Sequence, residues 1–147
     1  MAQTDDPLQL AQACAEKMYA ADLASRELGI AINIPKPGSA LAAMTVTAKM
    51  VNGHDVCHGG YVFTLADTAF AFACNAYNRV SVAATAAIEF LAPVRLDDRL
   101  VATATQRHRG RRSGTYDVNV TNQEGELVAL FRGRCVALEK PLLAPES

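Results

Sequence analysis

The segment from Gly60 to Tyr77, GYVFTLADTAFAFACNAY, is the feature that most constrains how this chain can fold. Apolar side chains fall on every side of a helix drawn through it, so we expect a helix buried all round rather than one with an exposed face. Asp67 is its only charged side chain. An unpaired carboxylate is costly in an apolar interior, and its pKa is open to tuning there. Asp67 is therefore a candidate functional acid. The alternative is an Asp that hydrogen-bonds nearby backbone or lies in a polar gap between subunits.

The residues before this helix, Asn52 to Gly60, add a second candidate group. Gly59 and Gly60 stand together just ahead of the apolar run, where glycines allow a sharp turn and close approach of a ligand. The free N–H groups and positive dipole end of a helix favour a developing negative charge. Gly59 N–H is thus a candidate oxyanion donor for acyl transfer, and Gly60 a candidate substrate-binding residue.

The spacing of these groups predicts an oligomer. Gly59 and Asp67 would lie about 12 Å apart along one helix, at a rise near 1.5 Å per residue. One reacting carbonyl carbon cannot touch both. If both act on one substrate, they come from two chains whose helices lie side by side and antiparallel, as in a two-fold dimer with two equivalent sites.

Length and composition narrow the class of protein. The 147 residues suit a single domain, 1–147, and the net charge of −1 gives no electrostatic case for nucleic acid or a membrane surface. The acidic start lacks the pattern of a signal peptide, and the apolar helix, interrupted by Asp67, is too short to span a bilayer. Cysteines without framework spacing suit reduced thiols. We expect a soluble, cytoplasmic protein. The cysteines are Cys14, Cys57, Cys74 and Cys135.

Periodicity predicts an α+β fold. An N-terminal helix (within 1–29), a strand and the buried helix precede four more strands, which favours a mainly antiparallel sheet wrapped around one apolar helix. Gly133, inside the last strand, indicates a bulge or a close approach. The elements expected are a helix at 7–28, a connector at 30–39, a strand at 44–50, the buried helix, and strands at 82–90, 100–106, 115–121 and 127–138.

Four runs of sequence carry a resemblance to a known family. They read NGHDVCHGGYVFTLADTAFAFACNAY, IEFLAPVR, RHRGRRSGTYDV and LVALFRGRC. Together they resemble the hotdog-fold acyl-CoA thioesterases of the phenylacetic-acid-degradation (PaaI) type, over residues 40–138. The resemblance implies hydrolysis of aryl-acyl-CoA thioesters, such as (hydroxy)phenylacetyl-CoA, to the free acid and CoA in phenylacetate catabolism. It implies no metal and no cofactor beyond the CoA of the substrate. It also implies a dimer that pairs its sheets edge to edge and shares its active sites, doubled into a homotetramer.

The resemblance also assigns roles to residues. Asp67 matches the catalytic carboxylate, acting as general base on water or as nucleophile. Gly59 matches the residue whose N–H polarises the thioester carbonyl. His58 and Asn52 match polar groups that flank the thioester, and Thr68 matches a small hydroxyl residue near the site.

One position departs from the family pattern. Ala83 stands where some relatives carry a serine that helps to place the water, so water placement must rely on other groups. Related acyl-CoA hydratases use an Asp with a His a few residues later, but no His follows Asp67 before His108. A hydratase and a non-catalytic acyl-CoA-binding module remain the alternatives.

A basic cluster lies between two expected strands. Its surface could simply be solvated, or its arginines could bind the phosphates of CoA, for which the guanidinium fork is suited. Nucleic acid is disfavoured because no base-stacking aromatics lie nearby and the net charge is slightly negative. The resemblance implies that this loop contacts the nucleotide, with Arg111 and Arg112 as ligands and Ser113 and Gly114 along the pantetheine path. The cluster comprises Arg107, Arg109, Arg111 and Arg112, around Gly110.

The sequence gives weaker support to other roles for the histidines and cysteines. Cys57 and His58 could form a nucleophile pair, but immediate neighbours rarely point at one another. His58 could instead cap the loop. A zinc set drawn from His54, Cys57, His58 and His108 lacks the usual ligand spacing.

Overall fold

The computed structural model describes residues 4–144. Its elements confirm the expected α+β class, with an antiparallel sheet wrapped around a long central helix and a helical N-terminal segment. No helix within the described range has the length and hydropathy needed to cross a membrane. In chain order the elements are α1 (Pro7–Ala21), α2 (Leu23–Glu27), β1 (Ala31–Lys36), β2 (Ser39–Thr45), the 3₁₀ helix η1 (Ala48–Met50), α3 (Gly59–Cys74), β3 (Ser81–Phe90), β4 (Arg99–Arg109), β5 (Ser113–Thr121) and β6 (Leu127–Ala137).

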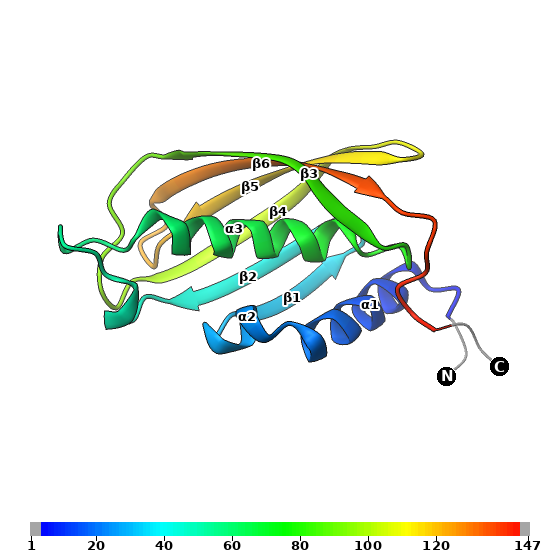
Figure 1. The fold of residues 1–147 in the computed structure, drawn as a ribbon, viewed down its shortest axis with the longest axis horizontal. Coiled ribbons are helices and arrows are strands. Elements are labelled where there is room, and N and C mark those ends of the chain that lie inside the picture. The colour runs from blue at the N-terminus through cyan, green and yellow to red at the C-terminus, as the bar shows by residue number, and fades with distance from the viewer. Residues whose placement is uncertain (1–3, 145–147) are drawn as a thin grey trace.

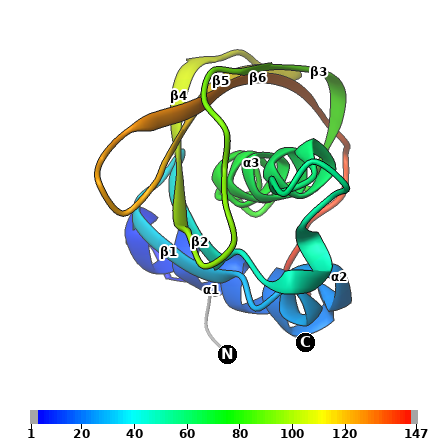
Figure 2. The same cartoon turned by 90° about the vertical axis from the view of Figure 1, so that its left-hand side faces the viewer.

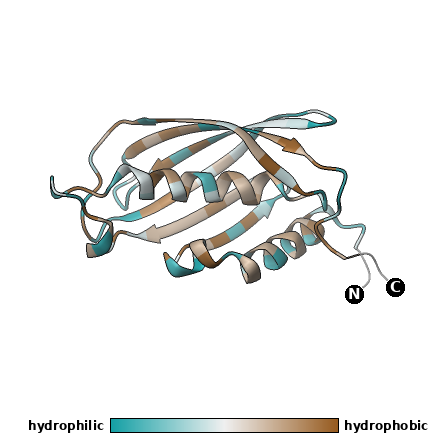
Figure 3. Ribbon diagram, in the orientation of Figure 1, coloured by the Kyte–Doolittle hydropathy of each residue, from teal (hydrophilic) through white to brown (hydrophobic). Residues whose placement is uncertain are grey.

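The sheet has the strand order β1-β2-β4-β5-β6-β3, and every neighbouring pair is antiparallel. It curves around α3, which lies inside the curve, while α1 and α2 lie beside the β1 side of the sheet (Figures 1 and 2). Hydrophobic positions are frequent along the strands, where they alternate with hydrophilic ones (Figure 3). The two free edges of the sheet are therefore β1 and β3.

Close packing between α3 and the sheet depends on a glycine. The ring of Phe70 packs against Tyr116 and Phe131, with ring centroids 5.8 Å away in both cases. A Cβ at Gly133 would lie 2.8 Å from that ring, which only a glycine avoids. The close approach expected at Gly133 is confirmed.

The expectation that α3 is buried all round is wrong for the single chain. Phe63, Thr64, Asp67 and Ala71 are only half-buried and Gly60 is exposed. Their spacing of three or four residues makes them one stripe along the helix. The remaining sides pack against the sheet and the N-terminal helices, so within residues 4–144 one face of α3 is uncovered, and it carries the acid.

The N-terminal helix, expected as one element over 7–28, is broken at Asp22. Asp22 leaves the helical conformation, and its carboxylate accepts hydrogen bonds from the N–H and the hydroxyl of Ser25, at 2.9 and 2.6 Å. An aspartate that caps a new helix offers the backbone an alternative to continuing the old one. The chain therefore turns between α1 and α2.

The expected connector at 30–39 and the strand at 44–50 are also wrong. The connector region forms β1 and the start of β2, while β2 ends at Thr45, before η1. Pro35 led to the prediction of a connector, because a proline usually interrupts a strand. It is tolerated here because it lies where the β1–β2 pairing is irregular, on an edge strand that can lack one N–H donor. The four later strands are confirmed, with ends shifted by up to three residues.

Candidate active site

The start of α3 presents an unused hydrogen-bond donor. His58 is the N-cap, and its Nδ1 accepts from Gly60 N–H at 2.9 Å. Tyr61 N–H donates to the carbonyl of His58. Gly59 N–H makes no hydrogen bond within residues 4–144. Because the first N–H groups of a helix have no intrahelical acceptor, this donor is open to a ligand. His58 thus caps the helix and leaves the neighbouring amide free.

Asn52 holds the loop that leads to this donor. Its Oδ1 accepts from His54 N–H at 2.8 Å and from Val56 N–H at 3.4 Å. The side-chain NH₂ group of Asn52 makes no hydrogen bond within the described part of the chain. Further on, Cys57 N–H donates to the carbonyl of Val94 at 2.6 Å. The loop is therefore anchored, and the Asn52 amide nitrogen remains available beside Gly59.

An apolar groove opens beside Gly59, with a volume of about 430 Å³. The ring of Phe90 covers Gly59 so closely that a Cβ there would lie 3.0 Å from the ring. Phe90 is 56% exposed, which is high for so large an apolar side chain. Sequence reasoning missed Phe90, because only the pairing of β3 brings the end of that strand over the start of α3. Other residues that line the groove are Asn52, Val62, Leu91, Pro93 and Val94.

Asp67 is half-buried on the uncovered face of α3, and its carboxylate has no hydrogen-bond or ion-pair partner among residues 4–144. Burial raises the pKa of the Asp67 carboxyl above its usual value, because desolvation penalises the charged form. A partly desolvated carboxylate without a partner is a better proton acceptor than one in water. Its chemistry suits a base or a nucleophile.

Gly59 and Asp67 are eight residues apart on the same helix, so the rise of the helix separates them by about 12 Å. One chain therefore cannot bring both to a single reacting carbon. The shared site between two copies stays a prediction.

Thr68 lies on another side of α3. It is buried, its hydroxyl donates to the carbonyl of Thr64 at 2.7 Å, and its Oγ1 is 3.4 Å from the Oγ of Ser25 in α2. Successive residues are about 100° apart around a helix, so Thr68 does not share the face of Asp67. Within one chain this hydroxyl packs against Ser25 of α2, and both hydroxyls give their protons to other acceptors.

The arginines of the β4–β5 region fall into two groups. Arg107 lies 3.5 Å from Asp117, whose pKa is lowered first of all by the bidentate hydrogen bonds from Arg132. Arg109 stacks on the ring of Tyr77, 3.6 Å from its centroid. Arg111 and Arg112 are exposed and form no ion pair within the described residues. The first group is engaged with other side chains, and the second is free to bind a ligand.

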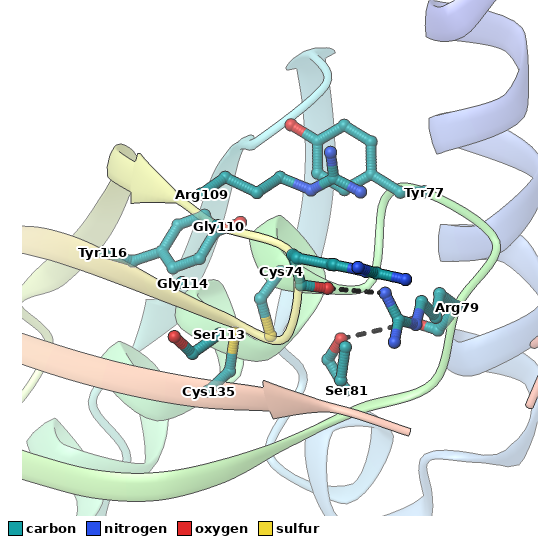
Figure 4. A pocket seen from close by; sticks show the side chains of 12 residues that line it. Cys74, Tyr77, Arg79, Ser81, Arg109, Gly110, Ser113, Gly114, Tyr116 and Cys135 are labelled. Atoms are coloured by element: carbon teal, nitrogen blue, oxygen red, sulfur yellow. Dashed lines mark hydrogen bonds between the residues drawn. The ribbon is translucent and has the colours of Figure 1, made fainter. Parts of the chain in front are cut away.

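Arg79, which sequence reasoning did not single out, holds this loop. It donates to the carbonyl of Arg111 at 2.7 Å and to that of Leu138 at 3.1 Å. Figure 4 shows it on one side of a small pocket whose other walls include Arg109, Ser113 and Gly114. An isolated arginine after a helix gives no sequence signal for this role. Ser113 and Gly114 thus lie beside the arginine loop, as expected for neighbours in sequence.

Comparison with known proteins identifies the family. A family model described as the thioesterase superfamily matches residues 54–129. The chain is 49% identical over 120 residues to acyl-coenzyme A thioesterase PaaI of Escherichia coli (strain K12), covering 82% of this chain and 86% of that protein.

Solved structures agree. The E. coli PaaI protein from the phenylacetic acid degradation operon superposes with a TM-score of 0.90 at 44% identity, covering 92% of this chain and 99% of that one. The smu.793 protein of Streptococcus mutans UA159, bound to acetyl CoA, superposes with a TM-score of 0.73 at 27% identity, covering 76% of this chain and 90% of that one. The resemblance to PaaI-type enzymes read from the sequence is confirmed, and the chain belongs to the thioesterase superfamily as a thioester hydrolase of the hotdog fold.

Proposed function

We propose that this protein is an acyl-CoA thioesterase that hydrolyses aryl-acyl-CoA thioesters, with (hydroxy)phenylacetyl-CoA as its substrate, to the free acid and CoA. The observation that carries the proposal is the N–H of Gly59, which has no acceptor within residues 4–144 and opens beside an apolar groove. The same helix bears Asp67, which has no partner in that range. The name of the E. coli relative and the operon of its solved structure support the choice of substrate.

In this proposal the thioester carbonyl accepts a hydrogen bond from Gly59 N–H. As a water or a carboxylate attacks the carbonyl carbon, negative charge gathers on the carbonyl oxygen, where one fixed donor is worth about 2.7–4 kcal/mol. Asp67 of a second copy removes a proton from the attacking water, or attacks the carbon itself. If Asp67 acts as a base, the intermediate collapses, the C–S bond breaks, and the sulfur takes the proton from Asp67, so CoA leaves as the thiol. If Asp67 attacks the carbon, the C–S bond breaks to leave a mixed anhydride, the thiolate takes a proton from water, and a second water hydrolyses the anhydride to the free acid. The amide of Asn52 flanks the thioester, and the reaction uses no separate cofactor.

The exposed surface of β3 supports the second copy. This strand is a free edge of the sheet, and an unpaired edge is a template for another strand. It is exposed along nearly all its length, although most of its side chains are apolar, with Val82 at 47%. Pairing β3 with its copy would continue the sheet across a two-fold axis and cover the open face of α3. Doubling of such a dimer into a tetramer is the further expectation from the family.

The groove supports an aryl acyl group. Its volume of about 430 Å³ lies in the range for small-ligand sites, about 300–1,000 Å³, and its walls are mostly apolar, with the Phe90 ring at its edge. An aromatic acyl group there would place its carbonyl next to Gly59. The exposed guanidinium groups of Arg111 and Arg112 suit the phosphates of CoA. The free thiols of the chain suit a reducing, cytoplasmic location.

A thiol-release assay across aryl, short-chain and long-chain acyl-CoAs tests this function. We expect phenylacetyl-CoA and its ring-hydroxylated forms to be hydrolysed with the highest kcat/KM. A clear preference for long fatty acyl chains would overturn the substrate class. Binding of acyl-CoA without any thiol release would overturn catalysis and favour a binding module.

A further inference from the structure

Two cysteines from distant parts of the chain lie together beneath the β4–β5 loop. Cys74 is the last residue of α3, and Cys135 lies in β6. Figure 4 shows both sulfur atoms side by side in the same small pocket. Both side chains are buried, at 5% and 4% exposure. The proposed hydrolysis uses neither thiol.

The electrostatic surroundings of the two thiols differ. The neighbouring Cys74 side chain lowers the pKa of the Cys135 thiol below its usual value, backbone hydrogen bonds and the charge of Arg134 act in the same direction, and burial opposes them. The pKa of Cys74 is raised, by its interaction with Cys135 and by burial. Cys135 is therefore the more acidic thiol of the pair, and Cys74, whose thiol donates to the carbonyl of Ala71 at 3.5 Å, is the less acidic one. A thiolate next to a thiol is the arrangement in which an oxidised sulfur can be resolved at once.

Access to Cys135 is limited by size. The pocket beside the two sulfur atoms holds a volume of about 20 Å³, enough for one water-sized molecule, which needs about 10–15 Å³ by the same kind of measure. Gly114 faces Cys135 across the β5–β6 ladder, and a Cβ there would stand 3.4 Å from the sulfur. Hydrogen peroxide is close to water in size, whereas glutathione and CoA are far too large. The pocket thus selects a small oxidant.

We propose that Cys74 and Cys135 form a peroxide-sensitive dithiol that closes to an intramolecular disulfide and reopens on reduction. The Cys135 thiolate attacks one oxygen of hydrogen peroxide, the O–O bond breaks, and Cys135 becomes a sulfenic acid as hydroxide leaves. The sulfur of Cys74 then attacks the sulfenic sulfur, the S–O bond breaks, and water leaves with the thiol proton of Cys74. Both sulfur atoms are oxidised by one electron each, and the peroxide is reduced by two.

The disulfide would join the end of α3 to β6. Asp67 precedes Cys74 by seven residues, about two helical turns, so the two lie on nearly the same side of α3. The charge of Asp67 also contributes to the raised pKa of Cys74. A disulfide at Cys74 would therefore shift the end of α3, the helix that carries Asp67. We expect oxidation to lower thioesterase activity for this reason.

The test uses the full-length protein treated with one equivalent of hydrogen peroxide. We expect two of the thiols to be lost, the mass to fall by two hydrogen atoms, a Cys74–Cys135 peptide pair in the digest, and full recovery with dithiothreitol. The variant Cys74→Ser should accumulate a sulfenic acid at Cys135 that dimedone traps, because the resolving thiol is gone. The variant Cys135→Ser should resist this dose.

Cys57→Ser is the matched control, since Cys57 is also buried but its thiol pKa is raised to about 11 by burial. It should oxidise as the wild type does. Retention of every thiol in the wild type, or oxidation of Cys14 or Cys57 ahead of the pair, would overturn the proposal. The peptide map of the wild type needs no variant to fold, and none of these readouts uses thioesterase activity, so they stand apart from the proposed function.

Discussion

The two ends of α3 differ in the space and the charged groups around them. At its start, a glycine pair and an N-cap histidine leave the Gly59 amide open beside an apolar groove. At its end, Cys74 is packed into a pocket of about 20 Å³, beneath a loop that Arg79 holds. The groove at the start of α3 is large enough for an acyl group. The pocket at its end is large enough for little more than a water molecule, and the charged groups near it, Arg111 and Arg112, lie on the protein surface. The start of α3 therefore lies beside an apolar groove suited to an acyl group, whereas its end lies beneath the exposed Arg111 and Arg112, a cationic rim suited to an anion.

Asp67, between the two ends, should give the largest effect on activity. Asp67→Asn removes the proton acceptor while keeping shape, so we expect kcat/KM in the thiol-release assay to fall by about 10²–10⁴-fold. Asp55→Asn is a suitable control, because Asp55 lies in the neighbouring loop with a φ of 61°, which Asn also tolerates. Turnover near that of the wild type in Asp67→Asn would remove this acid from the mechanism.

Gly59→Ala tests the open end. The new Cβ would meet the Phe90 ring at 3.0 Å and disturb the carbonyl position, so we expect kcat/KM to drop by about tenfold, equivalent to 1.4 kcal/mol. Adding Phe90→Ala should restore much of the loss, because the clash partner is gone. Gly53→Ala is the control, since a Cβ there meets nothing within 4 Å. No recovery in the double variant would mean that Phe90 does not shape this end.

The cationic rim should affect binding rather than turnover. Replacing both Arg111 and Arg112 with Ala should raise KM by about tenfold with kcat nearly unchanged, because two charge-assisted contacts to phosphate are lost. Arg107→Ala should change KM less, since Arg107 is paired with Asp117. A fall in kcat with unchanged KM would contradict the assignment of Arg111 and Arg112 to substrate binding.

The smallest effect concerns stability. The pKa of Asp67 is raised in the folded state, so folding favours its protonated form: its stabilising contribution is present at low pH and lost as pH rises through the folded-state pKa. Asp67→Asn should therefore raise Tm slightly at neutral pH. The difference should vanish once the pH falls below the usual range of an aspartate. Thermal melts from acid to neutral pH provide the measurement, and a lower Tm of the variant at neutral pH would indicate a partner for the carboxylate that stabilises its charge.

Much of the fold was predictable from local patterns. The alternating runs of β4, β5 and β6 were found within three residues at either end, because hydrophobic alternation reports directly which face of a strand is buried. β1 was missed, because Pro35 reads as a loop signal unless the strand is known to lie at an edge. The break at Asp22 was missed because a capping aspartate within a helical pattern looks like one polar position among others.

The candidate site also has features that local sequence predicts and features that only long-range contacts create. The candidate roles of Gly59 and Asp67 rest on neighbours along one helix, so they could be proposed from the sequence. The ring of Phe90 over Gly59, the anchoring of the loop by Arg79, and the meeting of Cys74 with Cys135 join residues at least 30 positions apart. No local pattern reports such contacts, because strand pairing and the curve of the sheet create them.

By itself, the amino-acid order determined that an apolar helix bearing a single acid follows a double-glycine turn, and that antiparallel strands must surround it. Those features follow from side-chain periodicity and backbone freedom, which act over a few residues. Only the tertiary structure decided that, among the described residues, nothing covers one face of α3 and nothing accepts from the amide of Gly59, and that two thiols share a pocket. Each of these depends on which distant elements pack together, and that is set by the burial of the whole chain at once.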